Sequence, residues 1–268
     1  MSMQNLRITT IQTNLHWENP TANLAMLEEK ISSISEPTDV IVLPEMFTTG
    51  FSMNVQALAE PMNFHTTKWM KQMAAKTGAL LLGSLIVKEE NTCFNRLIWM
   101  EPNGNFKTYD KRHLFRMADE DKIYSAGKNL LIAEWKGWKI CPMVCYDLRF
   151  PVWSRNRFDK DSNSLRYDVL VYVGNWPAAR THHWQALLKA RAIENLSYVV
   201  GVNRVGKDGK NVEYGGHSSI TSPQGEEVYQ AHAQEEIRTT ELNAEEFKNW
   251  RAKFPAYLDG DDFELSRS

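Results

Sequence analysis

Cysteine is scarce in this chain of 268 residues, which has only Cys93, Cys141 and Cys145. Three cysteines are an odd number and too few to stabilise a chain of this length through disulfide bonds, so the composition predicts a reducing compartment, the cytoplasm. In that setting a single cysteine is available as a nucleophile. The spacing of Cys141 and Cys145 comes with no neighbouring cluster of cysteine or histidine, so we expect no zinc site and no other metal.

An excess of positive charge is also missing. The chain has 31 Lys and Arg against 33 Asp and Glu, a net charge of −2, so no basic surplus neutralises nucleic-acid phosphates. Long apolar runs are absent too, and stretches such as 79–82 are far too short to span a bilayer. Residues 1–15 do not have the charged and apolar segments of a signal peptide. We therefore expect neither nucleic acid nor a membrane as partner.

The residues that are present are those of an ordinary globular protein, with 43% hydrophobic and 24% charged side chains. No repeat or Pro/Gly/Ser-rich linker divides the chain, which predicts a single domain over 1–268 with its core at about 6–263. Helices and strands alternate, but several strands follow one another through hairpins, so the pattern predicts an α/β protein with mixed sheets in layers. The expected strands lie at 6–13, 40–43, 79–87, 96–100, 130–135, 138–144, 168–173, 198–204, 218–222 and 227–230, and the expected helices at about 20–34, 66–76 and 182–195.

One of these helices carries an arginine on its apolar face. Trp184, Leu187, Leu188 and Arg191 follow one another at i, i+3, i+4 and i+7. An arginine in that position is rarely left unpaired, so we expect a buried or interfacial salt bridge, with Glu194 as the candidate partner. The alternative is a side chain whose stem packs while its charged end reaches solvent.

A cysteine stands at the end of a predicted strand, where a nucleophile is held rigidly and can face a cleft. Cys145 follows the strand at 139–144 directly. Free cysteine is also a common small core residue, and that explanation is the better one for Cys141 inside the strand. Nothing around Cys93 favours reactivity.

Two charged residues occupy comparable places. Glu45 follows the apolar strand at 40–43, where apolar surroundings would raise its pKa and suit it to act as a general base. Lys111 lies in the charged run 110–113, and its ammonium could stabilise an oxyanion or lower the pKa of a nearby thiol. Taken singly, each residue is more typical of a solvated surface than of a catalytic site.

Taken together, these residues and their neighbours resemble the nitrilase superfamily of carbon–nitrogen hydrolases. The resemblance extends from about Leu6 to Phe263. It rests on the segments Leu43-Pro44-Glu45, Tyr109-Asp110-Lys111-Arg112-His113-Leu114-Phe115, Cys145-Tyr146-Asp147-Leu148-Arg149-Phe150-Pro151, Ala190-Arg191-Ala192-Ile193-Glu194-Asn195 and Gly216-His217-Ser218.

The resemblance implies a fold and a set of site residues. The fold is an α-β-β-α sandwich with mixed sheets, which stacks on a second copy into four layers and so implies a homodimer. The site is a triad of Glu45, Lys111 and Cys145. Glu120 looks like the second glutamate of the family, and Asp119 is the alternative in this acidic stretch.

A cofactor-free amidase mechanism follows from these roles. Glu45 takes the thiol proton as Cys145 attacks an amide carbonyl. The Lys111 ammonium and the backbone N–H of Tyr146 are expected to hold the oxyanion. Ammonia leaves and a thioester forms, which Glu45, oriented by Glu120, hydrolyses by activating water.

Other segments resemble the omega-amidases of this superfamily, which release ammonia from the side-chain amides of α-keto acids such as α-ketoglutaramate and α-ketosuccinamate. Phe115 and Trp176 are expected to wall the pocket, with plain core packing as the alternative. The distal carboxylate of such a small-molecule amide needs a cation, for which Arg116 and Arg149 are the candidates. The segments that carry this resemblance are Gly174-Asn175-Trp176-Pro177, Arg180 and Phe254-Pro255-Ala256-Tyr257-Leu258-Asp259.

Three alternatives remain open at this point. A nitrilase, a carbamoylase or a deaminated-glutathione amidase would use the same triad. A Cys–His hydrolase would instead recruit His113, His182, His183 or His217 as its base. A non-catalytic interaction module would use none of these side chains chemically.

Overall fold

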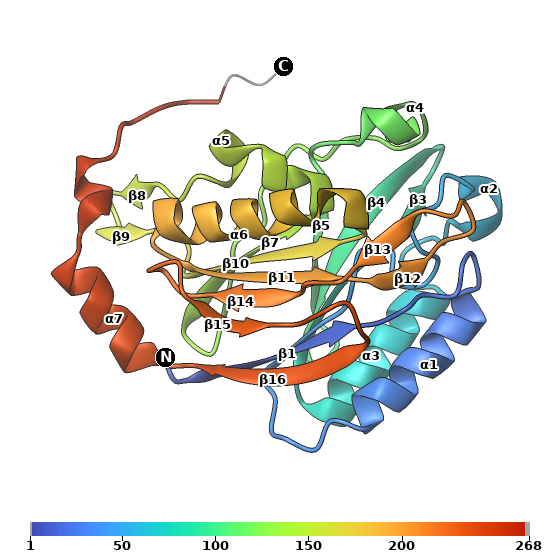
Figure 1. Ribbon diagram of the computed structural model, residues 1–268, viewed down its shortest axis with the longest axis horizontal. Helices are drawn as coiled ribbons and strands as arrows, with labels where there is room; N and C mark the ends of the chain where they lie inside the picture. The colour runs from blue at the N-terminus through green and yellow to red at the C-terminus, as the bar shows by residue number, and fades with distance from the viewer. Residues whose placement is uncertain (1, 266–268) are drawn as a thin grey trace.

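The structure is a computed structural model that describes residues 2–265 of the chain. Two six-stranded sheets pack face to face, and helices cover their outer faces (Figure 1). Both sheets contain parallel and antiparallel pairs. The prediction of an α/β protein built as an α-β-β-α sandwich with mixed sheets is therefore confirmed.

The first sheet carries three parallel strands at its centre, because helical crossovers connect β1 to β2 and β2 to β3. Its other strands pair antiparallel, with β16 beside β1, and β4 and β5 continuing from β3 as a meander. In spatial order the strands are β16 (Glu236–Leu242), β1 (Leu6–Gln12), β2 (Val40–Val42), β3 (Leu80–Glu89), β4 (Thr92–Met100) and β5 (Phe106–Asp110).

The second sheet repeats this arrangement. Its parallel centre is β7, β10 and β11, and its edges are antiparallel. In spatial order the strands are β15 (Glu227–Gln230), β14 (Ser219–Thr221), β11 (Tyr198–Asn203), β10 (Val169–Gly174), β7 (Trp138–Val144) and β6 (Ala133–Trp135). Two small two-stranded sheets are formed by β12 (Val205–Lys207) with β13 (Glu213–Gly215) and by β8 (Phe158–Asp159) with β9 (Ser164–Leu165).

Three long helices lie on the outer faces (Figure 1). Helices α1 (Pro20–Ser32) and α3 (His65–Thr77) cover the first sheet, and α3 ends at Gly78, whose φ of +69° glycine adopts without steric cost. Helix α6 (Thr181–Asn195) lies on the second sheet, so close that a Cβ on Gly201 would come within 2.5 Å of Leu188. The remaining helices are α2 (Val55–Leu58), α4 (Glu120–Ile123), α5 (Pro151–Ser154) and α7 (Ala244–Lys253). Short 3-10 turns span Arg116–Ala118, Cys145–Arg149, Ala178–Arg180 and Ala256–Asp259.

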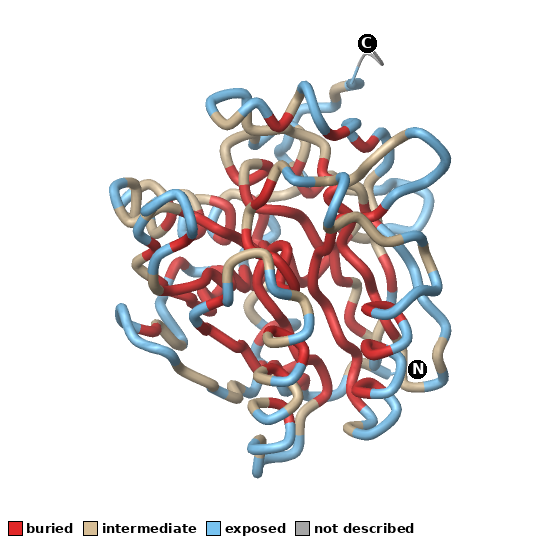
Figure 2. Tube along the Cα trace, turned by 90° about the vertical axis from the view of Figure 1, so that its right-hand side faces the viewer, coloured by how far each residue is buried: buried red, intermediate tan, exposed pale blue. Residues whose placement is uncertain are grey.

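The core follows from the period-two alternation of the strands. On β2, Val40 and Val42 face the second sheet, whereas Ile41 faces the helices. Figure 2 shows the resulting distribution, with buried strands in the middle of the molecule and exposed backbone at its rim.

The predicted elements differ from the observed ones at the edges of the sheets. The strand expected at 130–135 is reduced to β6, which starts at residue 133. The pattern also missed β16 and α7, because β16 is an edge strand of half-exposed and charged residues without a clear apolar alternation.

The salt bridge of Arg191 is confirmed. Its side chain is buried, and Nη1 lies 3.0 Å from Oε1 of Glu194. Nη2 also donates a 2.7 Å hydrogen bond to the carbonyl oxygen of Leu148, which links α6 to the turn that follows Cys145.

Among residues 2–265 no helix combines the length and the apolar character needed to cross a membrane.

Candidate active site

The ends of four strands meet in one cavity of about 440 Å³. Glu45 and Lys111 follow β2 and β5 of the first sheet, and Cys145 and Asn175 follow β7 and β10 of the second. Because the two sheets face each other, these strand ends bring all four side chains together. The lining residues are Glu45, Phe51, Lys111, Phe115, Met117, Ala118, Cys145, Tyr146, Arg149, Asn175, Trp176, Pro177, Ala179, Arg180, Asp208, Lys210, Val212 and Tyr214.

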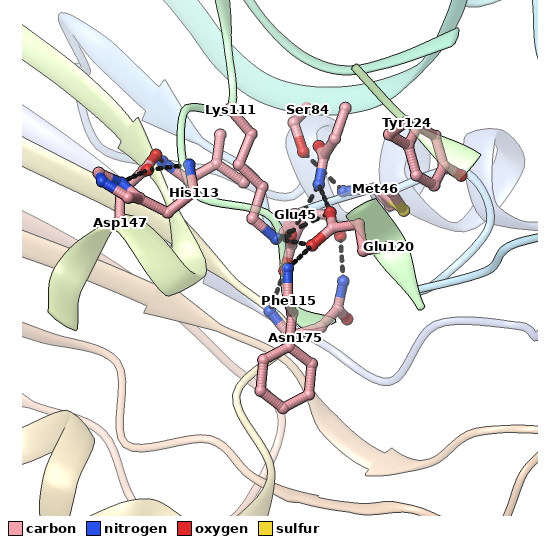
Figure 3. Close-up of polar contacts among 12 residues, drawn as sticks. Glu45, Met46, Ser84, Lys111, His113, Phe115, Glu120, Tyr124, Asp147 and Asn175 are labelled. Carbon is pink, nitrogen blue, oxygen red and sulfur yellow. Dashed lines mark hydrogen bonds and ion pairs between the residues drawn. The ribbon is translucent and has the colours of Figure 1, made fainter. Parts of the chain in front are cut away.

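The carboxylate of Glu45 is completely buried and held from several sides (Figure 3). Oε1 accepts hydrogen bonds from Nζ of Lys111 at 2.9 Å and from Nδ2 of Asn95 at 2.8 Å. Oε2 accepts from the backbone N–H of Asn175 at 2.9 Å, and the side chain of Asn175 donates to the Glu45 carbonyl at 2.7 Å. Three hydrogen bonds to the carboxylate and one to the backbone carbonyl therefore leave this side chain little rotational freedom.

Lys111 lies between two carboxylates. Nζ is 2.9 Å from Oε1 of Glu45 and 2.9 Å from both oxygens of Glu120, and it lies 5.1 Å from the centre of the Phe51 ring. Burial alone would lower the pKa of Lys111, but the two carboxylates raise it above its ordinary value. The residue is therefore an ammonium at neutral pH.

Glu120 rather than Asp119 is the second acidic residue of this cluster. Glu120 is buried at the start of α4, and its Oε2 accepts the backbone N–H of Phe115 at 2.6 Å. Burial raises the pKa of Glu120, an effect that Lys111 opposes. Asp119 is exposed and pairs with Lys122 instead, so the alternative assignment is wrong.

The backbone of Cys145 is strained, since its φ of +43° lies in the left-handed region that non-glycine residues rarely adopt. Its thiol is buried among charges. Burial and the neighbouring Glu45 raise the pKa of the thiol well above its ordinary value, while Lys111 acts in the opposite direction. Lys111 therefore lowers the thiol pKa in the expected direction, but burial and Glu45 outweigh its charge.

Aromatic rings and arginines form the outer part of the cavity. Phe115 and Trp176 both line it as predicted, and the Phe115 ring meets the Tyr146 ring edge-on at 5.0 Å. The guanidinium of Arg149 lies 4.8 Å from the Trp176 ring centre, and that of Arg180 lies 5.5 Å from the Phe115 ring centre. The guanidinium groups of Arg149 and Arg180 thus belong to the lining of the same cavity as Glu45 and Lys111.

Arg116 is not among these cations, so the expectation that it contacts a substrate in this cavity is wrong. Its side chain is 83% exposed, and it pairs with Asp121 at 2.6 Å. It points outward because the 3-10 turn at Arg116–Ala118 begins directly after Phe115, whose ring takes the inward position.

Sequence reasoning missed several residues that shape the site. Asn175 follows an apolar strand in the same way as Glu45, and this position could have identified it. Asn95 lies inside β4, where nothing local distinguishes it from a structural polar residue. Asp208 and Lys210 belong to the β12–β13 loop, whose approach to the cavity depends on the tertiary fold.

Neither a histidine nor a metal-binding group is found in this cavity among the described residues. The lining residues given above include no histidine, and the His113 ring contacts Asp147 rather than Cys145. In residues 2–265, no group of three or more His, Cys, Asp and Glu side chains is arranged to hold a metal ion.

The chain matches the sequence pattern of the family described as carbon-nitrogen hydrolase over residues 7–252. It is 47% identical to "Omega-amidase YafV" of Escherichia coli strain K12, in an alignment that covers 98% of this chain and 100% of the relative. It is 34% identical to "2-oxoglutaramate amidase" of Bacillus subtilis strain 168, over 94% of this chain and 96% of the relative.

A solved structure agrees with this result. The CN-hydrolase superfamily protein XC1258 from Xanthomonas campestris, which has an arsenic adduct in its active site, superposes with a TM-score of 0.96. It is 44% identical in sequence, with 98% of this chain and 100% of that chain covered.

Proposed function

Because the chain belongs to the carbon-nitrogen hydrolase family, we propose that it is an omega-amidase, a cysteine-dependent hydrolase that converts small α-keto acid ω-amides to dicarboxylic keto acids and ammonia. The relatives named omega-amidase and 2-oxoglutaramate amidase support this activity. The observation that carries the proposal is the buried contact of Glu45 with Lys111 in a cavity that also contains Cys145 and two arginines.

In the first half-reaction, Cys145 forms a bond to the amide carbon. Its proton passes to Glu45, which lies beside it, as the sulfur attacks. The carbonyl oxygen takes up negative charge, and the Lys111 ammonium and the backbone N–H of Tyr146 hold it. When the C–N bond breaks, the proton on Glu45 goes to the departing nitrogen, so ammonia leaves and a thioester remains.

The second half-reaction reverses these proton movements. Glu45 takes a proton from water, the hydroxide adds to the thioester carbon, and the thiol leaves with the proton that Glu45 returns. Glu120 remains bound to Lys111 throughout and keeps that ammonium directed at the oxyanion. Every group needed for the two steps comes from the chain itself.

The distal carboxylate of the keto acid fits the cationic side of the cavity. Neither Arg149 nor Arg180 forms an ion pair with a carboxylate in residues 2–265, so both are available to a ligand. Arg149 instead contacts Nδ1 of His183 at 3.0 Å. A planar guanidinium binds a carboxylate through two parallel hydrogen bonds, which selects amides that carry a carboxylate over neutral amides.

The first test is ammonia release from α-ketoglutaramate, α-ketosuccinamate, glutamine, a simple nitrile and a carbamoyl amino acid, each with wild type and Cys145→Ala. We expect turnover of the keto-amides that disappears in the variant. Turnover of only the nitrile or carbamoyl compound would retain the triad and reject the omega-amidase assignment. Activity that survives the substitution would reject the cysteine mechanism.

The second test concerns the carboxylate-binding arginines. Arg149→Met and Arg180→Met should each raise KM for α-ketoglutaramate by about tenfold or more, the size expected for a charged hydrogen bond. Arg116→Met is the matched control, since this arginine is exposed and paired outside the cavity. Equal KM values for all three variants would remove the arginines from substrate binding.

We also propose that the chain acts as a single domain, as a homodimer, and in the cytoplasm. The exposed apolar side chains of Ile193, Phe254 and Leu258 support a second copy as partner. The three free cysteines support a reducing compartment. Light scattering of the purified protein tests the dimer, and a monomer at micromolar concentration would reject it.

A further inference from the structure

A third buried carboxylate, that of Asp147, lies next to the cluster of Glu45, Lys111 and Glu120 (Figure 3). Oδ1 of Asp147 accepts hydrogen bonds from the backbone N–H and from Nδ1 of His113, at 2.9 and 2.7 Å. Oδ2 accepts from the hydroxyl of Tyr109 at 2.7 Å and from the backbone N–H of Val144 at 3.1 Å. A carboxylate only accepts, so Nδ1 of His113 carries the hydrogen.

These four donors come from both sheets. Tyr109 and His113 stand two residues before and two residues after Lys111, at the end of the first sheet. Val144 and Asp147 flank Cys145 at the end of the second. One carboxylate therefore ties the segment that carries the ammonium to the turn that carries the thiol.

The turn at Cys145 needs such a constraint. A φ of +43° at a non-glycine residue persists only where the surroundings enforce it. The His113 ring lies flat against the Phe150 ring, with centres 3.8 Å apart and planes 8° apart. This stack is a second contact between the segment that carries Lys111 and the chain that follows the Cys145 turn.

We propose that Asp147 is a positioning residue, which through His113 and Tyr109 fixes the distance between the Lys111 ammonium and the Cys145 thiol. The proposal rests on the amidase function proposed above. A looser tie displaces the ammonium from the oxyanion as it forms, and misplacement by about 1 Å can cost about 100-fold in rate. Arg180 comes from a different segment, and Arg149, at the far end of the turn, is also held to Nδ1 of His183 on α6 at 3.0 Å, so substrate binding changes little and the loss falls on kcat.

Two substitutions of His113 separate its hydrogen bond from its stacking. His113→Phe keeps a flat ring against Phe150, but its side chain cannot donate to Asp147, and only the backbone N–H contact remains. His113→Asn loses the ring but places an amide N–H where Nδ1–H was. We expect kcat of the phenylalanine variant to fall by about tenfold or more, with KM within about twofold, and the asparagine variant to recover most of the rate.

The control and the second readout exclude a purely structural role. His65→Phe makes the same change at an exposed histidine of α3 and should have no effect. The active fraction of each variant is titrated by stoichiometric alkylation of Cys145, and kcat is expressed per active site. In the His113→Phe variant the pH profile of alkylation should also move to higher pH, because the Lys111 ammonium lies farther from the thiol.

Three results would overturn the proposal: an unchanged kcat per active site in the phenylalanine variant, no rescue by asparagine, or an unchanged alkylation profile. If wild type releases no ammonia from any keto-amide, the function proposed above fails. The alkylation profiles of His113→Phe and His113→Asn then decide the role of Asp147 independently.

Discussion

At the scale of single residues, the charges of the cluster explain why the resting thiol keeps its proton. Lys111 contributes one positive charge against the carboxylates of Glu45 and Glu120, so a thiolate would add a further negative charge to a buried site. Burial is the largest cause of the raised pKa of Cys145, and the neighbouring Glu45 adds to it. This agrees with the proposed mechanism, in which the thiolate forms as Glu45 accepts the proton during attack.

This charge balance predicts the pH dependence of thiol alkylation. Because the thiol pKa is raised, the rate of alkylation by iodoacetamide should increase with pH through an inflection above the ordinary value for cysteine. Glu45→Gln removes a negative charge beside the thiol and should move the inflection to lower pH, although it abolishes most amidase turnover. Stopped alkylation assays followed by mass spectrometry measure both profiles. An inflection below that of free cysteine in wild type would contradict the assignment.

Glu120 acts through Lys111, and its removal should slow the reaction. Glu120→Gln keeps an acceptor for the Phe115 N–H but removes the negative charge that pairs with the Lys111 ammonium. Hydrogen bonds to charged groups contribute about 1.5–3 kcal/mol, so we expect kcat to fall by about 10- to 100-fold. Asp119→Asn is the matched control, and steady-state kinetics should show it close to wild type. Equal kcat values for the two variants would show that Glu120 does not contribute to the reaction through Lys111.

At the scale of elements, α6 stabilises the turn Cys145–Arg149 through a hydrogen bond. Arg191 joins Glu194 and the Leu148 carbonyl, and it lies on the buried face of the helix. Arg191→Met should destabilise the protein by about 2 kcal/mol, because it leaves a buried carbonyl and a partly buried carboxylate without their partner. Glu194→Gln should cost less, since the Leu148 contact remains. Urea unfolding measures both, and equal stabilities for the Arg191→Met variant and the wild type would show that the contact contributes nothing.

The elements that could be predicted from the sequence are those with a strong local signal. The start of α1 after Asn19 and the end of α3 at Gly78 follow from capping chemistry. Oδ1 of Asn19 accepts a hydrogen bond from the backbone N–H of Ala22 at 3.1 Å. Strands β2 and β10 follow from short β-branched runs. Strand β16 could not be found in this way, because its pairing with β1 depends on a contact between the two ends of the chain.

At the scale of the whole molecule, the site exists only where the two sheets meet. Local sequence marked Glu45 and Cys145 because each follows a predicted strand, and Lys111 because it lies in a charged run. The structure brings the three to one cavity. Local sequence could not show that Arg180 faces inward and Arg116 outward, since this depends on which turn covers the cavity. Resemblance at the level of motifs therefore predicted the buried cluster of the cavity better than its outer lining.

Ligand binding across the two sheets should stabilise the whole fold. Cys145→Ala removes turnover but leaves Arg149, Arg180 and the aromatic walls in place, so α-ketoglutaramate can bind without being consumed. At a ligand concentration of about 100 times Kd, linkage predicts a gain of about 2.7 kcal/mol in the free energy of unfolding. The gain at that same concentration should shrink in Cys145→Ala/Arg180→Met and persist in Cys145→Ala/Arg116→Met. Thermal unfolding with and without ligand measures it, and an equal gain in both double variants would place the carboxylate somewhere other than beside Arg180.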